Sequence, residues 1–221
     1  MKVVKNFLRD RYYELRRNYE VHWFNTYRKK YDSFTFAKKQ KIASRWLIQY
    51  PEQAHFDFEP VKYWLENLVD KPASVLEIGG WRGDLAQAAL TDLSFIDRWH
   101  NYDLIENNGS QKCQDHRYTL ITLKDDLWRT SLSFRYNALI ATHMIEHLNW
   151  REFTELAGWI PAEVVTVLFE APLPFSEENF SWKGDHSSHV FEKGWKQVNS
   201  EMKKHGFNIA YSVNNTVIYK R

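Results

Sequence analysis

Residues 75–84 read Val-Leu-Glu-Ile-Gly-Gly-Trp-Arg-Gly-Asp, and this stretch decides the fold class of the chain. An apolar run ends at Ile78, a cluster of glycines follows over residues 79–83, and residues 84–90 have the composition of a helix. A buried strand, a glycine turn and a helix form the first unit of a doubly wound α/β fold. Ligands of such folds bind at the carboxyl end of that strand, where a side chain would hold them away from the backbone. The stretch therefore predicts a nucleotide-like ligand.

Two common nucleotide motifs do not match this turn. A dinucleotide fingerprint that starts at Gly79 would need glycine at positions 81 and 84, which are Trp81 and Asp84. A phosphate-binding loop would need Gly-Lys-Ser or Gly-Lys-Thr, which does not follow. What remains is an acidic residue, Glu77, two positions before the first glycine, and a further glycine, Gly83, four positions after it.

The pattern Glu77-Ile78-Gly79 with Gly83 resembles motif I of the class I S-adenosylmethionine-dependent methyltransferases. The resemblance implies S-adenosylmethionine as cofactor, with the acidic residue near its methionine end and the glycines packed against it. Trp81 stands where glycine is usual in the family, so either the turn is wider or Trp81 covers the pocket. The turn residues expected to bind the cofactor are Glu77, Gly79, Gly80, Trp81 and Gly83.

Strand and helix signals alternate after the turn. Beyond the first strand, four more are predicted at 99–105, 118–123, 136–142 and 164–169, with helices around 84–92, 146–158 and 192–205. A terminal strand pair, 207–213 and 216–219, is joined by Asn214-Asn215. We expect an α/β fold with a Rossmann-like, doubly wound, mostly parallel seven-stranded sheet that ends in an antiparallel strand pair.

The first part of the chain predicts a basic helical extension. Apolar residues recur at helical spacing over residues 4–23, which predicts a first helix. A second helix is expected over 35–50, and a third begins at Pro60. We therefore divide the chain into an extension, 1–58, and a methyltransferase domain, 59–221. Residues 1–48 hold 13 Lys and Arg against 4 Asp and Glu, whereas the remainder holds 17 against 24. Such an arm can dock on the acidic body, or it can attract nucleic acid, an anionic membrane surface or an acidic substrate.

Two acidic positions follow the second and third predicted strands. Asp103 is best placed to hold a ribose, because one carboxylate can accept hydrogen bonds from both hydroxyls, and Glu106 is the next candidate. By the same resemblance, Asp126, next to Asp125, stands where the family's acidic residue contacts the adenine amino group.

The segment 136–148 carries a second resemblance. It is similar to the fourth strand of many class I enzymes, which is followed by two apolar residues and Glu-His-Leu, although Asn137 stands where Asp is commoner. Both resemblances together cover roughly residues 73–212. They place His143 beside the cofactor.

His143, Glu146 and His147 also spell the inverted zincin motif H-x-x-E-H, but a buried strand and a glycine turn precede it, which argues against a peptidase. Small-RNA 3′-end 2′-O-methyltransferases carry a similar metal-binding segment, Glu-x-x-Glu-His, and a later histidine that His189 matches here. His143 replaces their first glutamate, which disfavours magnesium because hard cations prefer oxygen ligands. We expect no metal, with His143, Glu146, His147 and His189 as the alternative metal site.

The loop 171–190 is rich in aromatic residues and histidines and leaves the ligand end of the fifth predicted strand. A histidine can remove a proton from an acceptor hydroxyl, and the candidates are His143, His186 and His189. We expect methyl transfer to an oxygen or nitrogen atom of a small molecule or glycan. The alternatives are a metal-dependent RNA 2′-O-methyltransferase, for which the basic arm would bind RNA, and a non-catalytic binding module whose pocket Trp81 alters.

The single cysteine, Cys113, fits a reducing compartment, and neither a cleavable signal nor an apolar run of membrane-spanning length is visible. We therefore expect a cytoplasmic protein without a transmembrane segment. The oligomeric state is not readable from the sequence.

Overall fold

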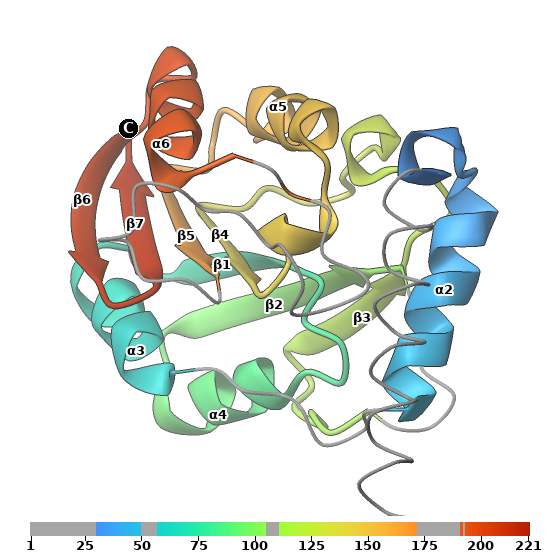
Figure 1. Ribbon diagram of the computed structural model, residues 1–221. Coiled ribbons are helices and arrows are strands. Elements are labelled where there is room, and N and C mark those ends of the chain that lie inside the picture. Colours follow the sequence, from blue (N-terminus) through green and yellow to red (C-terminus); the bar gives the residue numbers. More distant parts are fainter. Residues whose placement is uncertain (1–29, 50–56, 105–110, 172–190, 192) are drawn as a thin grey trace, which may run out of the picture.

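The structure is a computed structural model, and it describes residues 30–49, 57–104, 111–171, 191 and 193–221. Its centre is a seven-stranded sheet with the strand order β3-β2-β1-β4-β5-β7-β6 (Figure 1). The strands are β1 (Ala73–Ile78), β2 (Ile96–Asp103), β3 (Tyr118–Thr122), β4 (Ala138–Thr142), β5 (Thr166–Glu170), β6 (Asn208–Val213) and β7 (Thr216–Lys220). The predicted α/β fold is confirmed.

The pairing of the strands identifies the ligand edge. β1 pairs in parallel with both β2 and β4, β3 and β5 extend this parallel sheet, and β7 runs antiparallel between β5 and β6. The order of the chain through the sheet therefore reverses between β1 and β4. Ligands of open α/β sheets bind at the carboxyl ends of the two strands that flank such a reversal.

Helices cover both faces of the sheet (Figure 1). Two of them, α3 (Phe58–Asn67) and α4 (Asp84–Asp92), lie on one face, and α5 (Trp150–Trp159) and α6 (Trp195–Lys204) lie on the other. Alternate residues of β1 follow this division, since Val75 belongs to the buried cluster with α3 and α4, whereas Leu76 and Ile78 belong to the cluster with α5 and α6. The sheet is therefore buried on both faces, as the apolar strand sequences predict.

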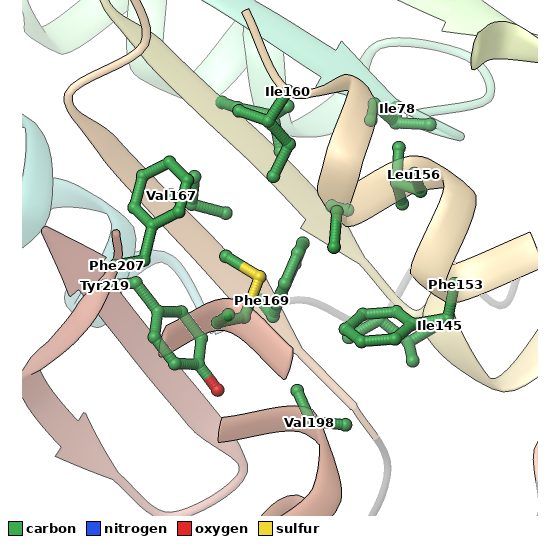
Figure 2. Packing of buried hydrophobic residues seen from close by; sticks show 14 of the residues in the cluster. Ile78, Ile145, Phe153, Leu156, Ile160, Val167, Phe169, Val198, Phe207 and Tyr219 are labelled. Atoms are coloured by element: carbon green, nitrogen blue, oxygen red, sulfur yellow. The ribbon is translucent and has the colours of Figure 1, made fainter. Parts of the chain in front are cut away.

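Aromatic rings fill the core between α5, α6 and the sheet (Figure 2). Phe153 of α5 meets Phe169 of β5 edge to face with ring centroids 6.1 Å apart, and Phe191 at 5.6 Å. Phe169 in turn meets Tyr219 of β7 at 5.8 Å. Each such buried ring contributes about 1.5–3 kcal/mol by burial, so this cluster fixes α5 and α6 on the sheet.

The predicted helix over 146–158 is wrong at its start. Residues Ile145–His147 form a short 3₁₀ helix, η3, and α5 begins at Trp150. Asn149 caps α5, because its side chain accepts from the Glu152 backbone N–H at 2.8 Å while Glu152 accepts from the Asn149 N–H at 2.9 Å. This reciprocal capping box sets the first turn of the helix after residue 149.

The remaining boundaries agree to within a few residues. The helix predicted over 35–50 is α2 (Phe36–Gln49), preceded by the 3₁₀ helix η1 (Tyr31–Ser33). The helix predicted from Pro60 begins two residues earlier, because the Asp57 side chain accepts from the Glu59 N–H at 3.2 Å and caps it. The helix expected over residues 4–23 lies outside the described residues, and none of the described helices could cross a membrane.

Loss of the capping box should loosen α5. Replacing Asn149 by alanine leaves the Glu152 N–H without its partner, so we expect the free energy of unfolding to fall by about 1 kcal/mol. Urea denaturation followed by circular dichroism measures this change. Glu155→Ala, at an exposed position of the same helix, is the control and should stay within about 0.5 kcal/mol of the wild type. Equal losses in both variants would contradict the assignment of the cap.

Candidate functional site

The glycine turn lies at the carboxyl end of β1, at the reversal point of the sheet, and its backbone is left-handed at three positions. The angle φ is +74° at Gly79, +48° at Trp81 and +77° at Gly83, and α4 starts immediately after Gly83. A Cβ atom at Gly83 would also lie 2.6 Å from the ring of Tyr118. Only glycine fits there, both by conformation and by space.

The end of β2 holds the turn in place. The Gly80 N–H donates to Asn101 Oδ1 at 3.0 Å, and the Trp81 N–H donates to Asp103 Oδ2 at 2.8 Å. Asn101 Nδ2 donates back to the Trp81 carbonyl at 3.2 Å. Asp103 was predicted for this site, but Asn101 was not. Its only signal in the sequence is a polar residue two positions before Asp103, on the same face of a buried strand.

Glu77 lies directly beneath the turn. Its side chain is 1% exposed, and its Oε2 accepts from the Trp99 indole N–H at 2.7 Å. A Cβ atom at Gly80 would lie 2.1 Å from the Glu77 carboxyl carbon, so any larger residue at position 80 would displace the carboxyl group. Its other oxygen, Oε1, is buried without a hydrogen-bond partner in the described part of the chain.

Burial raises the pKa of Glu77 to about 7. The hydrogen bond from Trp99 acts in the opposite direction, while the nearby carboxylates of Asp103 and Asp84 add to the increase. An acidic group poised near neutral pH, with an oxygen that lacks a donor, is suited to bind a cationic or N–H-bearing part of a ligand.

The Trp81 ring packs against its neighbour in the chain. The guanidinium carbon of Arg82 lies 4.3 Å from the centroid of that ring, and Arg82 Nε donates to Asp84 Oδ2 at 3.1 Å. The non-glycine residue is thus accommodated by its contact with Arg82, together with the two backbone hydrogen bonds to β2. Such a left-handed residue costs on the order of 1 kcal/mol, which the surrounding contacts must offset.

Two further predicted cofactor residues lie at the same edge. Asp103 is the last residue of β2 and is 5% exposed. Asp126 follows β3 and immediately precedes the 3₁₀ helix η2 (Leu127–Arg129), with its N–H bonded to Asp125 Oδ1 at 2.8 Å. Carboxyl ends of adjacent parallel strands meet at one edge, so these two acids lie where the sequence places them. Glu106 lies outside the described residues.

His143 follows β4 and is held between two buried glutamates. Its Nδ1 lies 3.4 Å from Glu146 Oε1, and its Nε2 lies 3.6 Å from Glu170 Oε1. The His143 backbone, at φ +50°, donates to the Glu170 carbonyl at 2.9 Å. Both ring nitrogens therefore face carboxylates, and Glu170, the last residue of β5, is a partner that the sequence analysis did not identify.

This arrangement argues against His143 as a general base. Burial alone would lower the pKa of His143, but its bonds to Glu146 and Glu170 outweigh burial and raise it to about 10. The imidazole is then already protonated at neutral pH and cannot accept the proton of an acceptor hydroxyl. The other two candidates, His186 and His189, lie outside the described residues.

The segment after β4 also touches the glycine turn. A Cβ atom at Gly79 would lie 3.1 Å from Met144 Cγ, so a side chain at position 79 would press on that segment. The β1 turn and the β4 turn thus meet at the reversal point, as the topology requires. His143 therefore lies on the side of this edge that continues towards β5.

The residues of the alternative metal site are only partly described. His143 precedes η3, whereas Glu146 and His147 lie within it, so the three do not share one face of an α-helix as the sequence pattern suggests. Among the described residues, no group of three or more histidine, cysteine or acidic side chains could hold a metal ion. His189 lies outside them, and the metal alternative stays a prediction.

No model of a protein family and no curated protein matches this sequence. Solved structures do match it in fold. The methyltransferase domain of bacterial CtHen1 is 17% identical with a TM-score of 0.53, over 74% of this chain and 97% of that one. The methyltransferase CalO6 is 14% identical with a TM-score of 0.56, over 80% of this chain but only 65% of CalO6.

A third structure of similar fold contains S-adenosylhomocysteine, the molecule that remains after S-adenosylmethionine has given up its methyl group. The 1,6-didemethyltoxoflavin-N1-methyltransferase of Burkholderia thailandensis, solved with S-adenosylhomocysteine, is 13% identical with a TM-score of 0.55, over 78% of this chain and 80% of that one. At these identities the likeness concerns the fold. Taken with the strand order and the glycine turn at the reversal point, it shows that this chain has the fold of the class I S-adenosylmethionine-dependent methyltransferases.

Proposed function

We propose that the protein transfers a methyl group from S-adenosylmethionine to an oxygen or nitrogen nucleophile of a small molecule or glycan. The observation that carries the proposal is the glycine turn, which Asn101 and Asp103 hold directly over the buried carboxyl of Glu77. Small-molecule methyltransferases among the structures of similar fold support the same reaction class.

The residues at this edge fit the cofactor chemically. Glu77 offers a buried oxygen without a donor, which suits the ammonium group of the methionine end. Asp103, at the end of β2, is placed to accept from ribose hydroxyls, and Asp126, after β3, is placed for the adenine amino group. At positions 79 and 80 the glycine backbone lets Met144 and the Glu77 carboxyl pack closely against the turn.

The bound cofactor would supply an electrophilic methyl group on a sulfonium. The protein's part is to align this group with the acceptor and to exclude water, which can supply much of the rate. His143, protonated between Glu146 and Glu170, contributes a fixed charge and a rigid turn after β4 rather than a proton acceptor. The base for a hydroxyl acceptor would then be His186 or His189.

Two alternatives remain under this proposal. A metal-dependent RNA 2′-O-methyltransferase is favoured by the basic residues 1–48. Metal analysis of protein purified without chelator separates it from a metal-free enzyme. A non-catalytic binding module, in which Trp81 alters the pocket, is separated by cofactor titration.

Removal of the charge on Asp103 should weaken cofactor binding. The variant Asp103→Asn keeps an acceptor for the Trp81 N–H but loses a charge-assisted bond to the ribose, so we expect the Kd for S-adenosylhomocysteine to rise about tenfold or more. Isothermal titration calorimetry measures it. Asp97→Asn, an exposed acid on the same strand, should bind like the wild type. If neither S-adenosylmethionine nor S-adenosylhomocysteine binds the wild-type protein at millimolar concentration, the proposed function is wrong.

Replacement of Glu77 by glutamine should stabilise the ligand-free protein at high pH. The folded-state pKa of about 7 exceeds the ordinary value of 4.5, so ionisation of Glu77 destabilises the fold as pH rises between these values. Relative to wild type, Glu77→Gln should gain about 3 kcal/mol in unfolding free energy between pH 4.5 and pH 8. It should also bind S-adenosylmethionine more weakly, because the ammonium group loses a carboxylate.

Urea denaturation of both proteins across this pH range, with Glu66→Gln on an exposed position of α3 as control, checks this prediction. A pH-independent difference between Glu77→Gln and wild type would contradict the raised pKa of Glu77.

The imidazole of His143 should stay charged through neutral pH, because the carboxylates of Glu146 and Glu170 hold its pKa near 10. The ring resonances, assigned by their loss in His143→Gln, should keep the chemical shifts of the protonated form between pH 6 and pH 8 in NMR spectra. Glu170→Gln removes one of the two carboxylates and should bring the titration closer to this range. A titration of the wild-type ring centred near pH 6.5 would restore His143 as a candidate base.

A further inference from the structure

Helix α2 belongs to the stretch that the sequence presents as a basic extension, yet it lies beside the ligand edge of the sheet (Figure 1). We propose that α2 is a wall of the cofactor site and holds both sides of it in place. The positioning residues are Lys39 and Gln40 of α2 and Tyr31 of η1, which precedes it. The inference rests on the proposed function for the identity of the ligand, but the contacts that carry it are independent of that ligand.

The first contact reaches the β2 side of the site. Gln40 Nε2 donates to the Leu104 carbonyl at 2.8 Å. Leu104 directly follows Asp103, whose carboxylate holds the Trp81 N–H. One side chain of α2 therefore fixes the chain at the point where it leaves the sheet, next to the residue proposed to bind the ribose.

The second contact reaches the β4 side through α5. Lys39 Nζ pairs with Glu152 Oε1, and the two side chains are 13% and 2% exposed. The other oxygen of Glu152 accepts from the Asn149 N–H and closes the capping box of α5. A buried carboxylate that loses one of its partners is costly, so Lys39 stabilises the conformation in which α5 begins after residue 149.

The third contact joins η1 to η3. The Tyr31 hydroxyl donates to the His147 carbonyl at 2.9 Å, and the Lys39 ammonium also lies 4.7 Å from the centroid of the Tyr31 ring. Glu146, the neighbour of His147, is one of the two glutamates that hold His143. The hydroxyl of Tyr31 thus links η1 to the segment that carries the His143 cluster.

The two contacts made by α2 itself come from one side of the helix. Phe36, Lys39 and Gln40 are spaced three and four apart, and Phe36 packs against the core cluster that includes Tyr102 and Ile145. Lys38 and Lys41 are exposed. A helix held by general attraction between a basic arm and an acidic body would not need this division. The contacts indicate a specific docking face instead.

Single substitutions on the two sides of α2 test the proposal in the full-length protein. Gln40→Ala leaves the Lys39–Glu152 pair intact, and we expect it to raise the Kd for S-adenosylhomocysteine fivefold to tenfold, because Leu104, next to Asp103, loses a partly buried hydrogen bond. Tyr31→Phe keeps the ring, removes the bond to His147 and should increase amide hydrogen exchange over residues 145–149. Calorimetry measures the Kd, and hydrogen exchange of the ligand-free protein measures the local opening of residues 102–104 and 145–149.

Lys38→Met and Lys41→Met are the matched controls, since each removes one positive charge from the same helix at an exposed position. Both should bind S-adenosylhomocysteine and exchange like the wild type. The proposal is overturned if Gln40→Ala and Tyr31→Phe leave both measurements unchanged, or if the two controls weaken binding as much as they do. Failure of the wild type to bind the cofactor would refute the proposed function, and the exchange measurement would still decide whether α2 holds these segments.

Discussion

The close approach of the glycine backbone to the buried carboxyl of Glu77 is the constraint on which the ligand edge depends. A single methyl group at Gly80 would overlap this carboxyl, so position 80 must be glycine as long as Glu77 occupies its place. The turn is then pulled onto the end of β2 by Asn101 and Asp103, and these bonds in turn decide which way the Trp81 backbone faces. Close packing beneath the turn and hydrogen bonds beside it together fix the backbone of residues 79–81.

The charges at this edge are arranged unequally on its two sides. Beneath the β1 turn, Glu77 has one hydrogen bond from Trp99 and an oxygen without a partner in the described structure, which makes its ionised form costly in the absence of a ligand. After β4, the carboxylates of Glu146 and Glu170 already share a cation, the imidazolium of His143. A positively charged ligand group would relieve this cost at Glu77, whereas the two glutamates after β4 already have one cation between them and keep a net charge of −1. The protein therefore gives up stability on the side where we propose the methionine end binds.

The sequence predicted the parts of this structure that local patterns determine. Glycine spacing after an apolar strand predicted the turn, and alternation of strands and helices predicted the sheet. Asn101 and Glu170 escaped prediction because their roles depend on hydrogen-bond partners that are distant in the chain. The start of α5 was misplaced for a different reason. Its capping box is a local signal, but the prediction started the helix at Glu146, whereas the Asn149 cap starts it only after residue 149.

The composition of the extension leaves its role open. Its excess of lysine and arginine predicts an arm that docks on the acidic body or attracts an anionic partner, and Lys38 and Lys41 are exposed. Lys39 and Gln40 lie between Lys38 and Lys41 in the sequence. Because a helix turns by about 100° per residue, they face the protein instead of the solvent. A polar residue one position away from a solvent-facing lysine can therefore be part of a buried network. Whether a basic segment binds a partner or completes the protein's own site is decided by which residues share its inner face, and in α2 this face meets both β2 and α5.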